Sequence, residues 1–446
     1  MEKNMVFPIP HWNARSKYYW ATGIPILIVT ILNLSLLHPT FSDDIFYFNV
    51  AKQILRGNFP YLHFFFAHPP LHEFLLAFLI TIYPTPILVG KLLATFSSSI
   101  SALLLFLIGL RIYGKKEAFL ATIFFLLSPA FLTFSSIGYG IWEMLLFLML
   151  SLWFFLEEKI LLASFLFILA FLTRYLALLY FPVYFFFNRK KFKDFLYCSL
   201  LLIFSSLFLF TLIFGENFLR DTILFHFTKI DFPTLPIEYF KMQLHLPLLL
   251  SSLILVKKKR KRHYVLPMIM DAFLLFSLRH PLYHYFIPSI PIYCLMLAEL
   301  AGGKWKNAAF VFIATWMVIA FNLESLDFYL NPKHSLVLQK VTEVVGSITG
   351  EDDEIFGEPI ITNFISLTLN RKIYKMWLDS FPIHLSYERD VLLTQLAQDK
   401  PKVFIDTEIE AFLYSSQLPE LAQFLQNYEL EEEISNLMKI KIYMLR

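Results

Sequence analysis

The stretch from His38 to Leu76, HPTFSDDIFYFNVAKQILRGNFPYLHFFFAHPPLHEFLL, follows the first long apolar run of the chain. It sets two adjacent carboxylates, Asp43 and Asp44, beside that run and continues to the basic tetrapeptide His68-Pro69-Pro70-Leu71. Charged groups next to a hydrocarbon phase are costly unless a partner or a reaction uses them. The side of the membrane on which these groups lie is therefore the first question.

The composition is that of a polytopic α-helical membrane protein. Of the 446 residues, 57% are hydrophobic and 16% are charged, and the mean hydropathy is +0.59, far from the usage of soluble globular proteins. The formal net charge of +3 is too small to indicate a nucleic-acid partner. Both cysteines, Cys198 and Cys294, lie inside apolar runs, which excludes a disulfide framework.

Basic clusters between the apolar runs predict the topology, because positive residues mark cytoplasmic loops. Lys3, Arg15 and Lys17 precede the first run, which predicts an uncleaved first span with a cytoplasmic N-terminus. A spanning helix needs about 20 apolar residues. Runs of this kind lie near 18–37, 86–110, 118–135, 139–156, 192–214, 242–256, 264–279, 283–301 and 306–322. The clusters are Arg111–Lys116, Glu157–Lys159, Arg189–Lys191, Lys257–Arg262 and Lys304–Lys306.

The apolar stretch 160–187 decides on which side of the membrane all later loops lie, because it can cross the membrane once or twice. Its only charge is Arg174, near the middle. As one span it would put the cations of 257–262 outside, whereas a hairpin that breaks at Arg174 puts every cluster inside. The hairpin is favoured and gives about eleven membrane segments. The apolar segment 71–83 is too short to span and is expected as a helix at the outer interface.

The loops that remain outside hold most of the polar groups. They are the first outer loop at 38–85, the segments 136–140, 215–241 and 279–284, and everything after Asn322. The tail has ordinary charge density and no spanning run. The sequence therefore predicts a transmembrane catalytic domain over 1–322 and a small extracytoplasmic α/β domain over 323–446.

Local patterns predict the elements of this tail. Helices are expected over 335–348, 385–398 and 418–426, strands over 372–376 and 402–405, and a closing hairpin from 428–434 and 438–445. The acidic run 351–354 could form a metal site, but a solvated turn explains it better.

The acidic pair opens a predicted helix over 43–56, with Ser42 as N-cap and Gly57 at its C-terminal end. Acidic residues in a first turn are stabilised by the helix dipole and need no catalytic purpose. However, Asp43 and Tyr47 are spaced i and i+4, so a carboxylate and a phenol share one helix face.

Several cationic groups are candidate partners for this carboxylate, each with a plain alternative. His68 could merely precede a proline pair that starts a helix. Arg174 is costly within a bilayer and indicates function, although it could pair with Glu143. Two groups of residues complete the set: His226 and Lys229, which could belong to a solvated loop, and Arg279, His284 and Tyr285, which could be snorkelling and interfacial side chains.

Together these groups predict a carboxylate that faces several cations at the outer membrane boundary. Cations would hold the phosphate of a lipid, and the carboxylate would act as a general base. A sugar carried on a lipid phosphate already has a good leaving group. One base would then suffice, unlike in glycoside hydrolysis, which uses a second carboxyl group as acid.

Ordered motifs make the chain similar to the GT-C glycosyltransferases, in the polyprenyl-phosphate-sugar branch that includes protein O-mannosyltransferases and the lipid A aminoarabinose transferase. The resemblance runs through almost the whole chain. Its motifs are Asp43-Asp44, Tyr47, Gly57, Pro60-Tyr61, His68-Pro69-Pro70-Leu71, "LTRY" at 172–175, "FHFTK" at 225–229 and "HYFIPSIP" at 284–291.

The resemblance implies a membrane enzyme that transfers a hexosyl or pentosyl group from a polyprenyl or dolichyl monophosphate donor to an acceptor hydroxyl, with inversion. Asp43 is implied as the base and Asp44 as its supporting neighbour. The resemblance further implies a donor-phosphate site formed from Tyr47, His68, Arg174, His226, Lys229, Arg279, His284 and Tyr285. No metal or other cofactor is expected. The acceptor, whether protein, lipid or glycan, is not specified by these motifs.

His68 and His284 depart from the family pattern, because they stand where relatives often have lysine or arginine. Phosphate binding by these residues is therefore expected to be weaker or pH-dependent. The segment MWLDSF at 376–381 is a near miss to the "WWDYG" motif of oligosaccharyltransferase catalytic subunits and is interpreted as an ordinary loop. The main alternative function is a lipid-linked sugar flippase or another transporter, since buried charge also marks substrate pathways.

Overall fold

The computed structural model describes residues 17–34, 42–228, 283–301, 333–409, 412–413, 419–435 and 439–446. The chain divides into two compact units. The first contains the described residues of 1–37, 91–206 and 231–328, and the second contains those of 38–90, 207–230 and 329–446.

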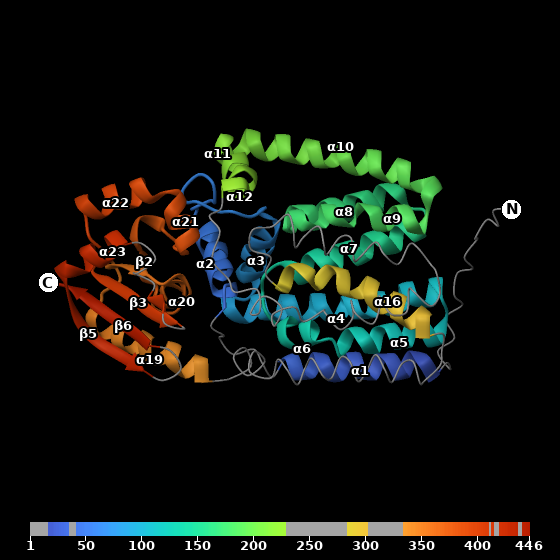
Figure 1. The fold of residues 1–446 in the computed structure, drawn as a ribbon, viewed down its shortest axis with the longest axis horizontal. Coiled ribbons are helices and arrows are strands. Elements are labelled where there is room, and N and C mark those ends of the chain that lie inside the picture. Colours follow the sequence, from blue (N-terminus) through green and yellow to red (C-terminus); the bar gives the residue numbers. More distant parts are fainter. Residues whose placement is uncertain are drawn as a thin grey trace. The chain divides into compact units, whose positions relative to one another are not determined.

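The first unit is a bundle of apolar helices (Figure 1). α7 and α8 pack side by side, and the Ser151 hydroxyl on α7 donates to the Ala163 carbonyl at 2.7 Å. α16 packs against α5, which also contacts α1. The helices are α1 (Lys17–Leu34), α4 (Pro86–Ile112), α5 (Lys115–Leu126), α6 (Pro129–Phe134), α7 (Ile141–Leu156), α8 (Ile160–Thr173), η1 (Tyr175–Tyr180), α9 (Phe181–Phe187), α10 (Arg189–Phe214), η4 (Tyr283–Ser289) and α16 (Ile290–Ala301).

Three of the charged clusters meet at one end of this bundle. Arg111, at the end of α4, pairs with Glu157 just after α7 and donates to the Leu156 carbonyl at 3.0 Å. Lys191 at the start of α10 lies 3.3 Å from Glu158. The prediction that these clusters share one side is supported by these ion pairs.

The predicted break at Arg174 is confirmed. α8 ends at Thr173, and Arg174 takes an extended conformation with φ −153° and ψ 130° before η1 begins. Two other expected spans are wrong in detail. The run 118–135 is divided between α5 and α6, and the run 283–301 opens with the 3-10 segment η4, which contains Pro288. The runs near 242–256, 264–279 and 306–322 lie outside the described residues.

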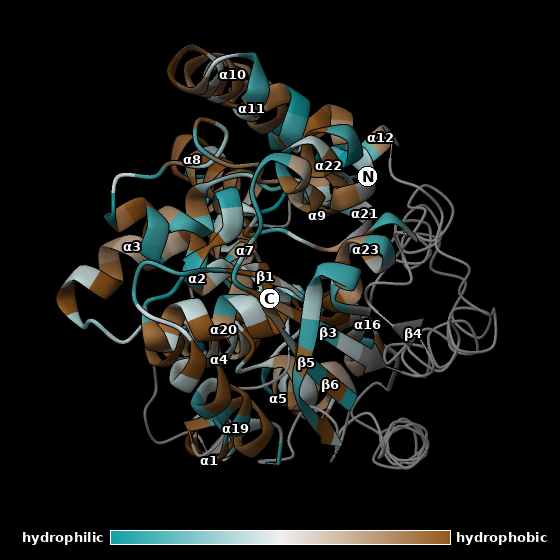
Figure 2. Cartoon of the chain, turned by 90° about the vertical axis from the view of Figure 1, so that its left-hand side faces the viewer, coloured by the Kyte–Doolittle hydropathy of each residue, from teal (hydrophilic) through white to brown (hydrophobic). Residues whose placement is uncertain are grey.

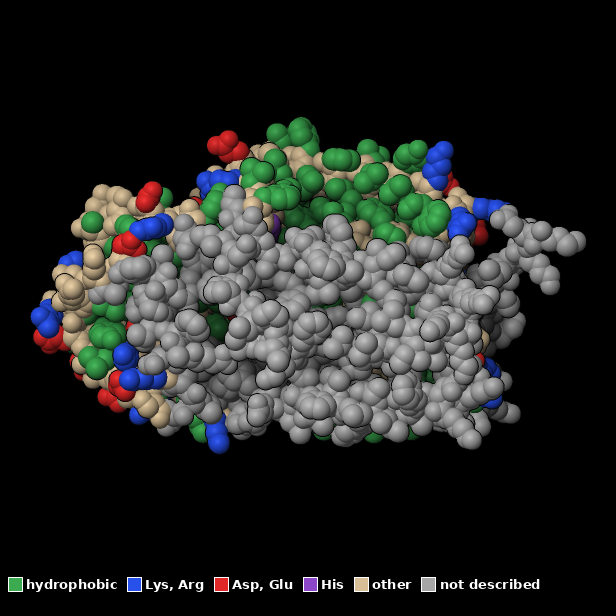
Figure 3. Space-filling model, in the orientation of Figure 1, with side chains coloured by type: hydrophobic (Ala, Val, Ile, Leu, Met, Phe, Trp, Pro, Cys, Tyr) green, Lys and Arg blue, Asp and Glu red, His purple; other side chains and the backbone are tan. Residues whose placement is uncertain are grey.

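Two described helices, α4 and α10, are long and apolar enough to cross a membrane by length and composition. α10 leaves large apolar side chains exposed, among them Leu201, Phe204 and Phe208. Figure 2 shows α1 and α10 as mostly hydrophobic, and Figure 3 shows hydrophobic side chains gathered over α10. Such a surface suits lipid better than water. The count of about eleven membrane segments stays a prediction.

The second unit contains a mixed sheet with strand order β2-β1-β3-β6-β5, and β4 pairs with β3. β1 lies parallel to β2 and β3, whereas β6 is antiparallel to both β3 and β5. The described strands are β1 (Glu354–Gly357), β2 (Lys372–Ile373), β3 (Val403–Ile409), β4 (Phe412–Leu413), β5 (Tyr428–Ser435) and β6 (Lys439–Leu445).

Alternating side chains give this sheet two apolar faces. Ile355 and Ile405 join a core with α19 (Lys333–Ile348) and α20 (Pro359–Leu369). Phe356 and Phe404 point the other way and pack with residues of α21 (Pro382–Tyr387), α22 (Arg389–Gln398) and α23 (Pro419–Phe424). Figure 1 shows α19 and α22 on opposite sides of the sheet. The result is a three-layer α/β arrangement.

Most of the predicted tail elements are confirmed, with two corrections. The expected helix 385–398 is divided into α21 and α22 at Glu388. The expected strand 372–376 stops at Ile373, because Lys375 has φ 45° and continues a 3-10 turn, η5 (Tyr374–Met376). The sequence reading missed β1 and α20. The domain boundary at 322/323 stays a prediction.

The first outer loop supplies α2 (Asp44–Leu55) and α3 (Leu71–Ile82), and α2 packs against α20. Asn49 Nδ2 donates to Asn363 Oδ1 at 2.8 Å, and both side chains are fully buried. One turn on, Lys52 Nζ donates to the carbonyls of Ser366 and Leu367 at 3.2 and 3.1 Å. These carbonyls lie at the C-terminal end of α20, where a cation is favoured by the helix dipole.

Replacing Asn49 tests this contact. Asn49→Ala removes the donor to Asn363 Oδ1 and leaves a buried acceptor without its partner, which typically costs about 1–3 kcal/mol. We expect a lower thermal unfolding midpoint for the detergent-purified protein, measured by intrinsic fluorescence. Asn58→Ala, at a half-buried position just past the same helix, is the control. Equal midpoints for both variants would contradict the assigned role.

Candidate active site

The acidic pair lies at the first turn of α2. Asp43 is the N-cap residue, is partly exposed, and makes no side-chain capping hydrogen bond. Asp44 is fully buried, and its Oδ1 accepts a hydrogen bond from Ser42 Oγ. The expectation that Ser42 would be the N-cap is therefore wrong, because its hydroxyl is used by Asp44. Of the two carboxylates, Asp43 is the one with access to a substrate.

Tyr47 and His68 form the next part of the site. Tyr47 Oη and His68 Nε2 are 3.0 Å apart, and the centres of their rings are 5.6 Å apart. Tyr61 Oη donates to the His68 carbonyl, which fixes the backbone before the proline pair. α3 begins directly after Pro70, as the helix-starting interpretation of that pair predicted. His68 is thus held beside Tyr47. Tyr47 itself lies one helical turn after Asp43.

His226 joins the same cluster from α12 (Phe225–Thr228). Its ring centre lies 6.1 Å from that of His68, and its Nε2 is 2.8 Å from the Ala67 carbonyl oxygen. A carbonyl only accepts, so the proton of neutral His226 is on Nε2. Two imidazoles, on segments far apart in sequence, therefore face each other beside the phenol of Tyr47.

A second group of predicted residues lies in the first unit. Arg174 is buried, and its Nε donates to the Tyr139 carbonyl at 3.0 Å. The ring of His284 packs on Tyr139 at 4.9 Å and on Tyr285 at 4.5 Å. The pairing of Arg174 with Glu143 stays a prediction.

The predicted site residues fall into two sets. Asp43, Asp44, Tyr47, His68 and His226 belong to the second unit. Arg174, His284 and Tyr285 belong to the first. Lys229 and Arg279 lie outside the described residues. The approach of the two sets to one another stays a prediction.

Glu358 is a site residue that sequence reasoning missed. It follows Gly357, whose φ of 137° and close approach to the Ile405 carbonyl leave no room for a side chain. Glu358 is buried, and its Oε2 caps α20 by accepting from the Ile361 amide at 2.8 Å. Burial raises the pKa of Glu358 to about 8, and the charge of Asp43 adds to the rise. The glycine and the following Glu-Pro pair were the available signal.

The acidic run 351–354 forms a turn with ion pairs, as predicted. Asp352 lies 2.8 Å from Lys372, and Asp353 lies 2.7 Å from Lys402. Across the described parts of the chain, no group of three or more His, Cys, Asp or Glu side chains could hold a metal ion. Independence from metals stays a prediction.

The MWLDSF segment is a loop after Met376, as predicted. Trp377, Leu378 and Asp379 are nevertheless buried, and they line a cavity of about 220 Å³ within the second unit. The sequence signal for this burial was a tryptophan and an aspartate, Trp377 and Asp379, soon after the short strand β2.

By sequence, the chain matches no protein-family model and no curated protein. By structure, it is similar to ArnT from Cupriavidus metallidurans, solved both bound to undecaprenyl phosphate and in the apo state. In each case the TM-score is 0.64 at 12% identity, over 96% of this chain and 98% of that chain. The Archaeoglobus fulgidus oligosaccharyltransferase tethered with an acceptor peptide gives a TM-score of 0.50 at 11% identity, over 97% of this chain and 75% of that one.

These likenesses show the fold. The sequence-based resemblance to the GT-C glycosyltransferases is confirmed at that level, by coverage of nearly the full length of both chains in the ArnT comparison. The roles of individual side chains rest on the geometry above.

The raised pKa of Glu358 predicts a specific pH dependence of stability. Between its ordinary pKa of 4.5 and about 8, the folded state keeps a proton that the unfolded state has released. The free energy of unfolding therefore falls as pH rises through that window. Glu358→Gln imitates the protonated form, so its thermal midpoint should gain on the wild type as pH rises from about 5 to about 8.5.

The control for this experiment is Glu343→Gln, because Glu343 is exposed on α19 and also loses one formal charge. A difference between Glu358→Gln and wild type that stays constant with pH would show that Glu358 is not a buried acid in the folded protein.

Proposed function

Because the chain shares the fold of ArnT, solved with undecaprenyl phosphate bound, we propose that it is an integral membrane glycosyltransferase that uses a polyprenyl or dolichyl monophosphate sugar. The observation that carries the proposal is one cluster at the first turns of α2. There an accessible carboxylate, Asp43, stands a helical turn from Tyr47, whose hydroxyl contacts His68 beside His226. A base and groups able to hold an anion are thus near each other.

The proposed reaction is a single displacement. The acceptor hydroxyl gives its proton to the Asp43 carboxylate, and its oxygen attacks the anomeric carbon of the donor sugar. The bond from that carbon to the phosphate oxygen breaks, and the electron pair leaves with the lipid phosphate. Attack opposite the leaving group inverts the anomeric centre. No acid is required, because a phosphate monoester leaves as a stable anion.

The proposed donor contacts within the second unit are His68 and His226, whose rings lie 6.1 Å apart. Imidazoles hold a phosphate well only when protonated, so donor binding should weaken as pH rises. We place the reaction on the extracytoplasmic face, with the tail domain on the same side.

Asp43→Asn tests the base. General-base catalysis is worth roughly 10²–10⁴-fold in rate, so we expect kcat to fall by at least about 100-fold. The Michaelis constant for the donor should hardly change. The measurement is transfer of radiolabel from a polyprenyl-phosphate hexose to a cell-envelope extract by the purified, reconstituted protein. Asp390→Asn, an exposed substitution on α22, is the matched control.

Two outcomes would overturn the assignment. Equal transfer by wild type and Asp43→Asn would exclude Asp43 as the base. Absence of transfer by the wild type, together with movement of the intact labelled lipid across the vesicle membrane, would favour the flippase or transporter.

His68→Ala tests the donor site. Loss of one charge-assisted hydrogen bond costs about 1.5–3 kcal/mol, so the Michaelis constant for the donor should rise roughly tenfold or more. The Michaelis constant for the acceptor should stay unchanged, which separates a donor contact from general damage. Tyr47→Phe removes only the hydroxyl that contacts His68 and should give a smaller rise. An effect of His68→Ala on kcat alone would contradict a role in donor binding.

A further inference from the structure

The second unit contains a cavity of about 220 Å³ that the reaction above does not use. Three segments far apart in sequence line it. They are 61–65 of the first outer loop, residues 217–221 around the start of the π-helical segment η2 (Arg220–Leu224), and residues of 375–395 in the tail. The volume is below the roughly 300 Å³ at which pockets for drug-sized ligands begin, so the cavity suits one small ring.

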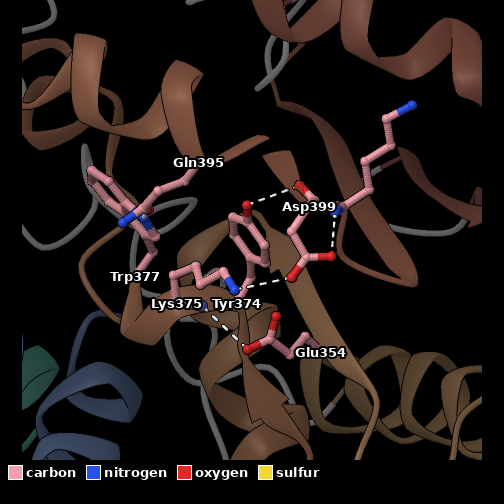
Figure 4. Close-up of polar contacts among 7 residues, drawn as sticks. Glu354, Tyr374, Lys375, Trp377, Gln395 and Asp399 are labelled. Atoms are coloured by element: carbon pink, nitrogen blue, oxygen red, sulfur yellow. Dashed lines mark hydrogen bonds and ion pairs between the residues drawn. The ribbon is translucent and has the colours of Figure 1, made fainter. Parts of the chain in front are cut away.

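Trp377 is one of the residues that line the cavity. Trp377 Nε1 donates to Gln395 Oε1 at 2.7 Å (Figure 4), so the polar edge of the ring is already used. Nearby, Lys375 Nζ lies 2.9 Å from Asp399 Oδ2. The ammonium group of Lys375 is therefore held by Asp399. What Trp377 offers a ligand is a flat apolar face.

Unusual backbone conformations gather at this cavity. Among the described residues, five besides glycine have positive φ, and three of them line the cavity: Tyr61 at 67°, Lys375 at 45° and Met376 at 62°. Each such residue costs about 1–3 kcal/mol and persists only where surrounding contacts hold it, commonly at binding sites. Tyr61 is held by Asn217, whose Nδ2 donates to the Tyr61 carbonyl at 3.0 Å.

The lining of the cavity also includes an acidic, incompletely paired side chain. The side chain of Asp379 is 2% exposed and its Oδ1 pairs with His384 Nδ1. Its Oδ2 is buried and accepts no hydrogen bond from any residue that the structure describes. A buried carboxylate oxygen without a hydrogen-bond donor raises the free energy of the folded state. Since Asp379 lines the cavity, a bound ligand could supply that donor.

Two further carboxylates line the cavity, and Arg220 lies between them. Arg220 Nε donates to Asp221 Oδ1 at 2.8 Å, and its Nη2 is 3.9 Å from Glu388. A cationic ligand would have to compete with Arg220 for these two groups. A neutral ligand with several hydroxyl groups would not, because it can donate to the carboxylates and accept from the guanidinium.

We propose that this cavity binds one sugar ring of a glycan acceptor, with Trp377 against the C–H face of the ring and Asp379 accepting from a hydroxyl. Naming the ligand an acceptor rests on the proposed function, whereas sugar binding itself does not. The first outer loop connects the cavity to the Tyr47 cluster. Phe65 packs on His384 at 5.3 Å, and the next residue, Phe66, packs on Tyr47 at 6.4 Å between ring centres. A chain held in the cavity would thus start next to the Tyr47 cluster.

Binding can be measured without any transfer. The full-length protein in detergent is titrated with methyl glycosides of glucose, mannose, galactose and N-acetylglucosamine, and with the tripeptide Gly-Lys-Gly, using saturation-transfer NMR. We expect at least one glycoside to bind, and Asp379→Asn to weaken it tenfold or more. Val391→Trp should also abolish binding, because Val391 is half exposed and lines the cavity, so a larger ring fills the space. Asp390→Asn, at an exposed position on the same helix that does not line the cavity, is the matched control.

The possible results are distinct. Binding of Gly-Lys-Gly alone, or glycoside binding unaffected by both Asp379→Asn and Val391→Trp, would overturn the proposal, as would absence of any glycoside binding. Val391→Trp keeps the test valid if Asp379→Asn does not fold. If a glycoside binds but no Asp43-dependent transfer is measured, the cavity is still a sugar-binding site and the proposed glycosyltransferase function is wrong. If Asp379→Asn leaves the Michaelis constant for the acceptor unchanged while transfer still depends on Asp43, the proposed function stands and the cavity is not the acceptor site.

Discussion

The contact between α2 and α20 is the constraint on which the candidate site depends. Asn49 Nδ2 donates to Asn363 Oδ1 between two fully buried side chains, so a shift of one helix against the other would break a buried hydrogen bond. Lys52 extends the contact by capping the carbonyls at the end of α20. Asp43, the N-cap residue of the same helix and six residues before Asn49, is therefore positioned by the tail domain. The base would be held by a folded domain and not by a free loop.

Asn363 also explains why the cavity and the base belong to one structure. Its Nδ2 donates to the Leu378 carbonyl at 2.8 Å, in the segment that carries Trp377 and Asp379. Ser380 Oγ donates to the Gly357 carbonyl at 2.8 Å, just before Glu358. A single asparagine, Asn363, thus joins the helix that begins at Asp43 to the segment that lines the cavity.

Much of this could be predicted from local signals, and the rest depends on tertiary contacts. The sequence predicts the apolar runs, the break at Arg174 and the proline pair before α3, because each depends on the free energy of a few neighbouring residues. β1 could not be predicted, because it has four residues and derives its strand conformation from parallel neighbours. Glu358 was missed for the same reason: only the fold brings it near Asp43. The burial of the MWLDSF side chains could not be predicted either, because it depends on packing against the sheet.

The carboxyl groups of Asp44 and Glu358, at this end of α2 and α20, are both engaged within the fold. Asp44 is turned inward and bonded to Ser42, and Glu358, with its pKa raised to about 8, keeps its proton at neutral pH. Two ionised carboxylates side by side would each raise the pKa of the other and leave one of them a poor base. Burying Glu358 avoids that conflict while its side-chain Oε2 still caps α20. The proposed reaction, whose leaving group is already a phosphate, needs one base and no acid, and an accessible Asp43 beside a protonated Glu358 would meet that need.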